Sequence, residues 1–302
     1  MRKTLTILLC ALLLTALTGC GGEPGPPEED AALTVAATTY PVYCFATAVT
    51  EGAQGVEVEL LVNQQTSCLH DYTLTVNDMK LLEGADAVVM NGAGLEDFLS
   101  DAMSQLSAAV IDCSEGVELL PLPEDDGHGH DPHIWMDPAR AAVMVDNIAA
   151  GLSALDGENA GLYADNAARA GEELQALLDR WSGAFDPQDP PRLITFHDGF
   201  GYLADAFGLD ILRSIEEEEG SEVSARELAE LEELIRTENL PAIFTEVNGS
   251  DASARALARD TGAEVYALSL CMSGEESGLA PYLAAIEGDL TAVRDAMGGD
   301  AP

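Results

Sequence analysis

Short apolar segments alternate with amphipathic ones over the first third of the chain. Leu33–Thr38 is rich in β-branched residues, and Val56–Val62 alternates apolar with acidic positions, as half-buried strands do. Pro41 begins a helical pattern that runs to about Glu51, and a second helix is predicted from Thr75 to Leu82, with Thr75 and Asp78 well placed for its N-terminal turn. The short apolar run Ala87–Met90 predicts a buried strand, and Glu96–Leu106 predicts a further helix. The alternation of predicted strands and helices indicates a mostly parallel sheet that is covered by helices on both faces.

The same alternation returns after the prolines at 187, 190 and 191. Ser224 and Glu227 form a capping box that opens a predicted helix. The predicted strands of this second region are Leu193–Phe196, Ile211–Ile215, Ala242–Thr245 and Val265–Leu268. Between the two regions, apolar spacing predicts a nearly continuous helix from Pro138 to about Trp181, with glycines at 151, 157 and 161 where it could break.

The predicted fold class is therefore α/β, with two lobes that each contain a mostly parallel sheet flanked by helices and that are joined by a long helical spine. We place the N-terminal lobe at residues 33–136, the linking helix at 137–186 and the C-terminal lobe at 187–302.

The first residues have the features of a targeting segment and are set apart from the fold. Arg2 and Lys3 precede an apolar stretch, Leu5–Leu17, that is too short for a stable membrane-spanning helix. Leu-Thr-Gly-Cys at 17–20 resembles the bacterial lipobox, which predicts a signal peptide at 1–19, lipidation of Cys20 and a tether at 20–32. The alternative is an ordinary secretory signal with an incidental cysteine. Either way we expect an extracytoplasmic protein, and the lipobox predicts an anchor in the cell membrane.

The charge of the chain restricts its partners. With 54 acidic against 13 basic residues, the formal net charge is −41. Nucleic-acid binding is excluded, because affinity for phosphate backbones depends on many Lys and Arg contacts. A surface of this charge fits the gathering of cations or a high-salt habitat.

The six cysteines have different predicted fates. Cys10 leaves with the signal peptide and Cys20 takes the lipid. In an oxidising compartment the remaining four can form disulfides, with three connectivities that the sequence does not distinguish. These four are Cys44, Cys68, Cys113 and Cys271.

The five histidines are all predicted to lie in loops. His70 follows the second strand and His197 directly follows Leu193–Phe196, which places both beyond the carboxyl ends of strands, where open α/β sheets bind ligands. The other three, His128, His130 and His133, cluster in one acidic loop. Neutral imidazoles from separate segments suit a borderline cation such as zinc, and each site histidine has an aspartate nearby that could orient its ring.

With these histidine motifs the sequence resembles a known family, the zinc/manganese solute-binding lipoproteins of bacterial ABC importers. The resemblance implies a metal-binding member of the periplasmic binding protein folds, with two α/β lobes bridged by one long rigid helix. It also implies an ABC permease and its ATPase as partners, and a monomer that is not an enzyme. The matching segments are Thr-Thr-Tyr-Pro-Val at 38–42, Leu-His-Asp-Tyr at 69–72, Asn-Gly-Ala-Gly-Leu-Glu at 91–96, Asp-Pro-His-Ile-Trp-Met-Asp-Pro at 131–138, Phe-His-Asp-Gly-Phe-Gly-Tyr at 196–202, Phe-Thr-Glu at 244–246 and Val-Tyr-Ala-Leu at 265–268.

By this resemblance the metal ligands are His70, His133 and His197. Zn²⁺ is favoured over Mn²⁺, because manganese-handling members tend to have a carboxylate where this chain has His197. At the fourth position the family commonly has an aspartate, whereas this chain has Ser269. Water, Glu246 or the Cys271 thiolate could fill that position. Alternatively, Cys68 and Cys271 could form a disulfide across the cleft.

His128 and His130 resemble the short His-rich loop that many zinc-specific members carry before the Asp-Pro-His motif. This resemblance predicts accessory capture of zinc near the site. A solvated loop broken by glycines is the alternative.

Three other functions are considered. A manganese-binding member of the same family would share most of these motifs. A hydrolase with three histidines on zinc would use Glu246 as its base, although the chain lacks a His-Glu-x-x-His helix. A surface adhesin could use the same fold for cell adhesion.

Overall fold

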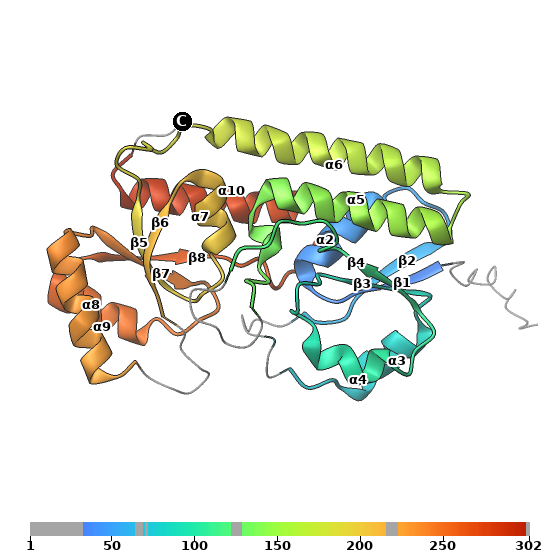
Figure 1. Cartoon of the computed structure of the whole chain (residues 1–302), viewed down its shortest axis with the longest axis horizontal. Coiled ribbons are helices and arrows are strands. Elements are labelled where there is room, and N and C mark those ends of the chain that lie inside the picture. The colour runs from blue at the N-terminus through green and yellow to red at the C-terminus, as the bar shows by residue number, and fades with distance from the viewer. Residues whose placement is uncertain (1–32, 64–68, 70–71, 122–128, 216–222, 300–302) are drawn as a thin grey trace, which may run out of the picture. The chain divides into compact units, whose positions relative to one another are not determined.

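Two four-stranded parallel sheets with the same strand order form the framework of the chain (Figure 1). The computed structural model describes residues 33–63, 69, 72–121, 129–215 and 223–299. The predictions for the signal peptide, Cys20 and the tether lie outside this range. No helix in the described ranges combines the length and apolarity that a membrane span needs.

The first sheet has the order β2-β1-β3-β4, and the second has the equivalent order β6-β5-β7-β8. The two-lobed α/β class predicted from the alternation of elements is therefore confirmed. The strands of the first sheet are β1 (Leu33–Ala37), β2 (Val56–Leu60), β3 (Ala87–Met90) and β4 (Ala109–Asp112). Those of the second are β5 (Arg192–Phe196), β6 (Asp210–Ser214), β7 (Ala242–Glu246) and β8 (Glu264–Leu268).

Helices cover both faces of the first sheet, with α2 and α5 on the side opposite α3 and α4 (Figure 1). The predicted capping role of Thr75 and Asp78 is confirmed, since the two residues form a reciprocal capping box at the start of α3. The helices of this region are α2 (Tyr40–Val49), α3 (Val76–Gly84), the 3-10 turn η1 (Asp97–Leu99), α4 (Ser100–Met103) and the 3-10 turn η2 (Ile134–Met136).

The second sheet packs against α9 through β7 and β8, and against α10 through β8. Ser224 caps α8 by accepting a hydrogen bond from the Glu227 amide at 3.2 Å. The helices of this region are α7 (Gly201–Phe207), α8 (Ala225–Glu238), α9 (Ala252–Thr261) and α10 (Ala280–Ala296).

The predicted helical spine consists of two helices rather than one. These are α5 (Pro138–Leu155) and α6 (Ala160–Trp181), which pack side by side (Figure 1). The break contains Gly157, and Asp156 stabilises it by accepting hydrogen bonds from Asn159 and from the Tyr163 hydroxyl. The longer helix, α6, contacts α2 of the first lobe and α10 of the second, so it bridges the two lobes.

The predicted helix from Glu96 to Leu106 is much shorter than expected. Only η1 and the single turn of α4 form, and the chain leaves the helix after Met103. The Ser104 hydroxyl and the side-chain amide of Gln105 both donate to the backbone carbonyl of Asp101. Such local side-chain bonds compete with the helical backbone and explain the early end.

Glu96 fixes the turn that follows β3. Its buried carboxylate accepts hydrogen bonds from the Thr38 hydroxyl at 2.6 Å and from the amides of Asn91 at 2.7 Å and Gly92 at 3.0 Å. At Gly92 φ is +81°, and an added Cβ would lie 1.9 Å from Oδ1 of Asp112, so the turn requires glycine. Burial raises the pKa of Glu96 to about 7, although the three hydrogen bonds lower it.

This raised pKa predicts a pH-dependent effect of Glu96→Gln. Between the ordinary carboxyl pKa and about pH 7 the folded state binds the proton more tightly than the unfolded state, so the contribution of Glu96 to stability is lost as pH rises through that window. Glutamine does not titrate. We therefore expect the difference in free energy of unfolding between wild type and variant to shrink by about 3 kcal/mol from pH 5 to pH 8. Urea unfolding at both pH values measures it, and a constant difference would contradict the assignment.

Candidate metal centre

The carboxyl ends of β5 and β7 bring His197 and Glu246 together. These strands are neighbours, with Phe196 opposite Thr245, so the next residues along each strand lie at the same edge of the sheet. The strand order reverses between β5 and β7, which is the position where open α/β sheets bind ligands. His197 is 7% exposed and Glu246 is 3% exposed.

His133 reaches this edge from the segment that precedes α5. Its ring centroid lies 5.5 Å from that of His197, with an angle of 88° between the rings. A Cβ added at Gly199 would lie 3.0 Å from Cδ2 of His133, so the absence of a side chain there allows the imidazole to approach. Two predicted ligands from different lobes are thus adjacent in the structure.

Asp131 orients the His133 ring. Its Oδ1 lies 2.7 Å from Nδ1 of His133 and also accepts a hydrogen bond from the His133 amide at 2.9 Å. Because Nδ1 is engaged, Nε2 is the nitrogen left for a metal. Burial lowers the pKa of His133, but the hydrogen bond to Asp131 and the charges of Asp131, Asp198 and Glu246 raise it, with a net upward shift.

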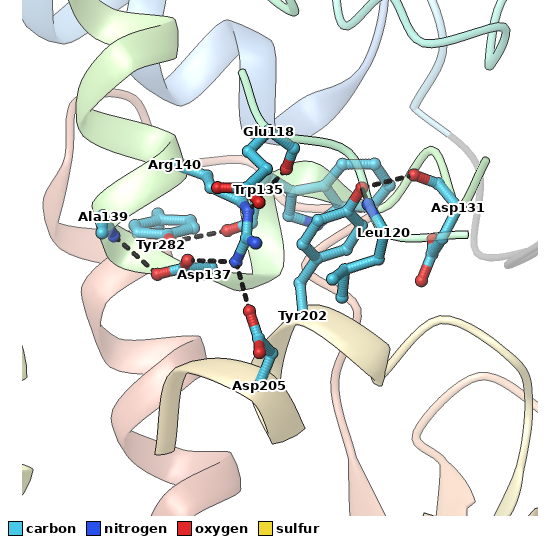
Figure 2. A network of polar contacts seen from close by, with 10 residues as sticks. All are labelled: Glu118, Leu120, Asp131, Trp135, Asp137, Ala139, Arg140, Tyr202, Asp205 and Tyr282. Carbon is cyan, nitrogen blue, oxygen red and sulfur yellow. Dashed lines mark hydrogen bonds and ion pairs between the residues drawn. The ribbon is translucent and has the colours of Figure 1, made fainter. Parts of the chain in front are cut away.

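A network across the two lobes holds Asp131 in place (Figure 2). The Tyr202 hydroxyl, on α7, donates to the Asp131 carbonyl at 2.8 Å and accepts from the Leu120 amide at 2.9 Å. A Cβ at Gly201 would lie 2.8 Å from Oδ2 of Asp131, so α7 begins in close contact with this carboxylate. The orientation of His133 therefore depends on the second lobe.

Arg140, near the start of α5, extends this network (Figure 2). Its guanidinium bridges Asp137 at 2.6 Å and Asp205 of α7 at 2.8 Å, and lies 4.8 Å from the centre of the Tyr202 ring. The hydrogen bonds and the cation–π contact together tie α5 to α7.

Trp135 connects the His133 segment of the first lobe to two parts of the second lobe. Its indole donates to the Leu270 carbonyl at 2.9 Å, and its own carbonyl accepts from the Tyr282 hydroxyl at 2.6 Å. The Trp135 ring is fully buried, 5.2 Å from the ring of His133. Packing around Trp135 thus sets the position of the first-lobe ligand relative to the second lobe.

Ser269 does not present a carboxylate, but Asp289 of α10 lies directly behind it. The Ser269 amide donates to Oδ1 of Asp289 at 2.7 Å, and Oδ2 has no hydrogen-bond partner among the described residues. Burial raises the pKa of Asp289 well above its usual range, and the charge of Glu246 adds to the shift. Asp289 was missed from the sequence. Its position on the buried stripe of α10, next to Leu290, was the available signal.

The other predicted site residues are placed differently. The neighbouring Cys44 side chain and burial together raise the pKa of the Cys271 thiol. His130 is exposed and pairs with Pro121 in an antiparallel bridge. His70, Cys68 and His128 lie outside the described residues, and within those residues no three His, Cys, Asp or Glu side chains form a group that could hold a metal ion.

The described side chains do not complete a metal site by themselves, but their chemistry suits a borderline metal. Two buried imidazoles meet at right angles, one is oriented by a carboxylate, and the charge of a buried glutamate acts on it. Zinc ions in proteins accept such nitrogen and oxygen ligands, and an aspartate behind the histidine fixes its tautomer.

Two α/β lobes with equivalent strand order that meet around a pair of buried histidines define a class, the two-lobed solute-binding proteins. The chain belongs to the ZnuA family, described as zinc-uptake complex component A, periplasmic, whose model matches residues 35–296. The resemblance seen in the motifs is confirmed. The family consists of metal-binding transport proteins rather than enzymes, so the hydrolase alternative is wrong.

Individual relatives agree with this membership. The chain is 28% identical over 317 residues to the zinc-binding lipoprotein AdcA of Streptococcus pneumoniae, covering 99% of this chain but 62% of AdcA. It is 30% identical over 260 residues to the manganese-binding lipoprotein MntA of Bacillus subtilis, covering 83% of each. The solved structure of the laminin-binding protein Lmb of Streptococcus agalactiae, described as bifunctional with adhesin and metal transporting activity, matches with a TM-score of 0.73 and 27% identity, covering 86% of this chain and 99% of Lmb.

The Asp131–His133 contact predicts a loss of affinity in Asp131→Asn. An amide in place of the carboxylate weakens the bond to Nδ1 and lowers the basicity of the ring, so we expect zinc affinity to fall about 10–100-fold. Competition with a fluorescent zinc chelator measures the change. Asp260→Asn, an exposed change on α9, is the matched control and should leave affinity unchanged. Equal affinity in both variants would remove Asp131 from the account.

Proposed function

We propose that this chain captures Zn²⁺ between its two lobes and delivers it to the permease of an ABC importer that is driven by its ATPase. The observation that carries the proposal is the contact between His133 and His197, which come from different lobes and lie 5.5 Å apart between ring centroids. A site divided in this way binds its cargo when the lobes are together and releases it when they separate. The zinc ion is transported cargo.

The proposed ligands are His133, His197, His70 and Glu246. Support for Glu246 comes from its position at the end of β7, beside His197, and from its effect on His133. The thiol of Cys271 interacts with Cys44, which favours the glutamate or a water molecule as the fourth ligand. His128 and His130 are kept as accessory residues that would raise the local zinc concentration.

Zinc rather than manganese is the proposed cargo, because imidazole nitrogens suit zinc while manganese prefers oxygen ligands. One relative is named for zinc and another for manganese, so the metal preference of this chain has to be measured. The test is calorimetric titration of the metal-free full chain in detergent with each metal. We expect one zinc per chain, bound at least 100-fold more tightly than manganese. Tighter binding of manganese, or no binding of zinc, would refute the proposal.

We further propose that the protein is a monomer held outside the cytoplasm by lipid on Cys20. The support is the lipobox at 17–20 and the lipoprotein names of relatives. Growth with a labelled fatty acid should label wild type but not Cys20→Ala, and equal labelling would contradict the anchor.

A further inference from the structure

Two buried cysteines from different lobes are neighbours in the structure. Cys44 belongs to α2, and Cys271 belongs to the segment between β8 and α10. They are 0% and 4% exposed, and the two thiols are close enough for Cys44 to raise the pKa of Cys271. In the structure they are unbonded sulfurs, and the proposed metal site uses neither.

The surrounding contacts fix this juxtaposition independently. Tyr40, Cys44 and Thr47 recur at helical spacing on one face of α2. The Tyr40 hydroxyl donates to the carbonyl of Glu276 at 3.0 Å, and the Gly278 amide donates to the Thr47 hydroxyl at 2.8 Å. Because these bonds lie on either side of Cys44, the segment 271–278 follows this face of the helix.

A second set of contacts holds the middle of the segment. Asn63 and Gly274 exchange two hydrogen bonds. The side-chain amide of Asn63 donates to the Gly274 carbonyl at 2.9 Å, and the Gly274 backbone amide donates to Oδ1 of Asn63 at 3.2 Å. A Cβ at Gly274 would lie 2.1 Å from Cζ of Tyr40, so the backbone packs directly on the tyrosine ring. The segment therefore has little freedom to move Cys271 away from α2.

The backbone of Cys271 is itself unusual. Its φ is +56°, in the left-handed region that residues with a side chain seldom adopt. The Cys271 amide donates to the Ser269 hydroxyl at 3.1 Å, which closes a tight turn after β8.

We propose that Cys44 and Cys271 form a disulfide bond that links the two lobes covalently. The bond forms between the two sulfurs as each thiol loses its proton, and the two electrons pass to the disulfide of an extracytoplasmic thiol oxidoreductase, which is reduced to a dithiol. Because both cysteines are buried once the lobes have met, the exchange takes place during folding, when the thiols are accessible. This proposal rests on the proposed extracytoplasmic location, because disulfide bonds persist in oxidising compartments.

The cross-link would limit how the lobes separate. It joins α2 to the turn that begins at Ser269, beside the end of β7 where Glu246 lies. Opening of the site would then be a rotation around this link and not a full separation. The pairing differs from the Cys68–Cys271 bond considered from the sequence alone.

Peptide mapping tests the bond without any need for zinc, so its outcome is separate from that of the proposed function. The full chain is purified without reductant, alkylated in denaturant, and digested with pepsin at acid pH, where thiol exchange is slow. We expect the peptides that contain Cys44 and Cys271 to be joined and Cys113, at the end of β4, to be alkylated. Alkylation of both cysteines, or a bond from Cys271 to Cys68, would overturn the proposal.

Thermal unfolding gives a second readout. Reduction should lower the melting temperature of wild type by roughly 5–10 °C, because a disulfide that closes a long loop typically stabilises a protein of this size by that much. Cys113→Ala, which removes a buried cysteine outside the pair, should show the same drop. A Cys44→Ala/Cys271→Ala variant should show none. If wild type unfolds at the same temperature with and without reductant, the link is absent.

Discussion

His197→Ala is expected to lower zinc affinity by about 100–1000-fold. Structural zinc sites with four ligands bind with about 10–16 kcal/mol, which is roughly 2.5–4 kcal/mol for each ligand. Loss of one imidazole removes that share, and 1.4 kcal/mol corresponds to a factor of ten. His197 follows the last paired residue of β5, so loss of its side chain leaves the strand pairing intact and the fold should survive. Calorimetric titration measures the change.

His130→Ala is the matched control for this variant. His130 is exposed and is one of the two proposed accessory residues, which raise the local zinc concentration but do not ligate the bound ion, so its loss should not change the equilibrium affinity. We expect its affinity to remain within about threefold of wild type. A His197→Ala protein that binds zinc as tightly as this control would show that the second lobe does not supply the ligand.

Trp135→Ala is expected to destabilise the protein by about 3–5 kcal/mol. The ring is fully buried, and its removal leaves a large cavity between the lobes. The Leu270 carbonyl also loses its indole donor. Guanidinium unfolding, with the slope checked for a two-state transition, measures the loss.

Trp135→Phe separates packing from hydrogen bonding at the same position. It keeps most of the apolar volume and removes only the donor to Leu270, so we expect a loss of about 1–2 kcal/mol. Its zinc affinity should fall less than that of the alanine variant, because the neighbouring His133 remains supported. Equal stability of wild type and Trp135→Ala would contradict the role of this residue in joining the lobes.

Local signals were sufficient for most of the secondary structure. The apolar run Ala87–Met90 became β3 with those bounds, and the capping residues Thr75 and Ser224 begin α3 and α8 as predicted. The break between α5 and α6 was harder, because three glycines offered places for it. Only the hydrogen bonds of Asp156 select Gly157.

The candidate site depended on a different kind of information. His133 and His197 were identified because each stands in a recognisable motif, but their contact follows from the register of β5 and β7 and from the fold of the α5 segment. Asp289 and the Cys44–Cys271 pair were not found from the sequence. Asp289 bonds to Ser269, which lies 20 residues away along the chain, and Cys44 lies 227 residues from Cys271. Hydrophobic periodicity does not encode contacts over such distances.

The most direct test of the central claim is a crystal structure of the zinc-loaded full chain with diffraction data on both sides of the zinc absorption edge. The account predicts one anomalous peak between the lobes, about 2.0–2.1 Å from a ring nitrogen of His133 and of His197. A peak that contacts residues of one lobe only, or no peak at this position in zinc-loaded crystals, would contradict it.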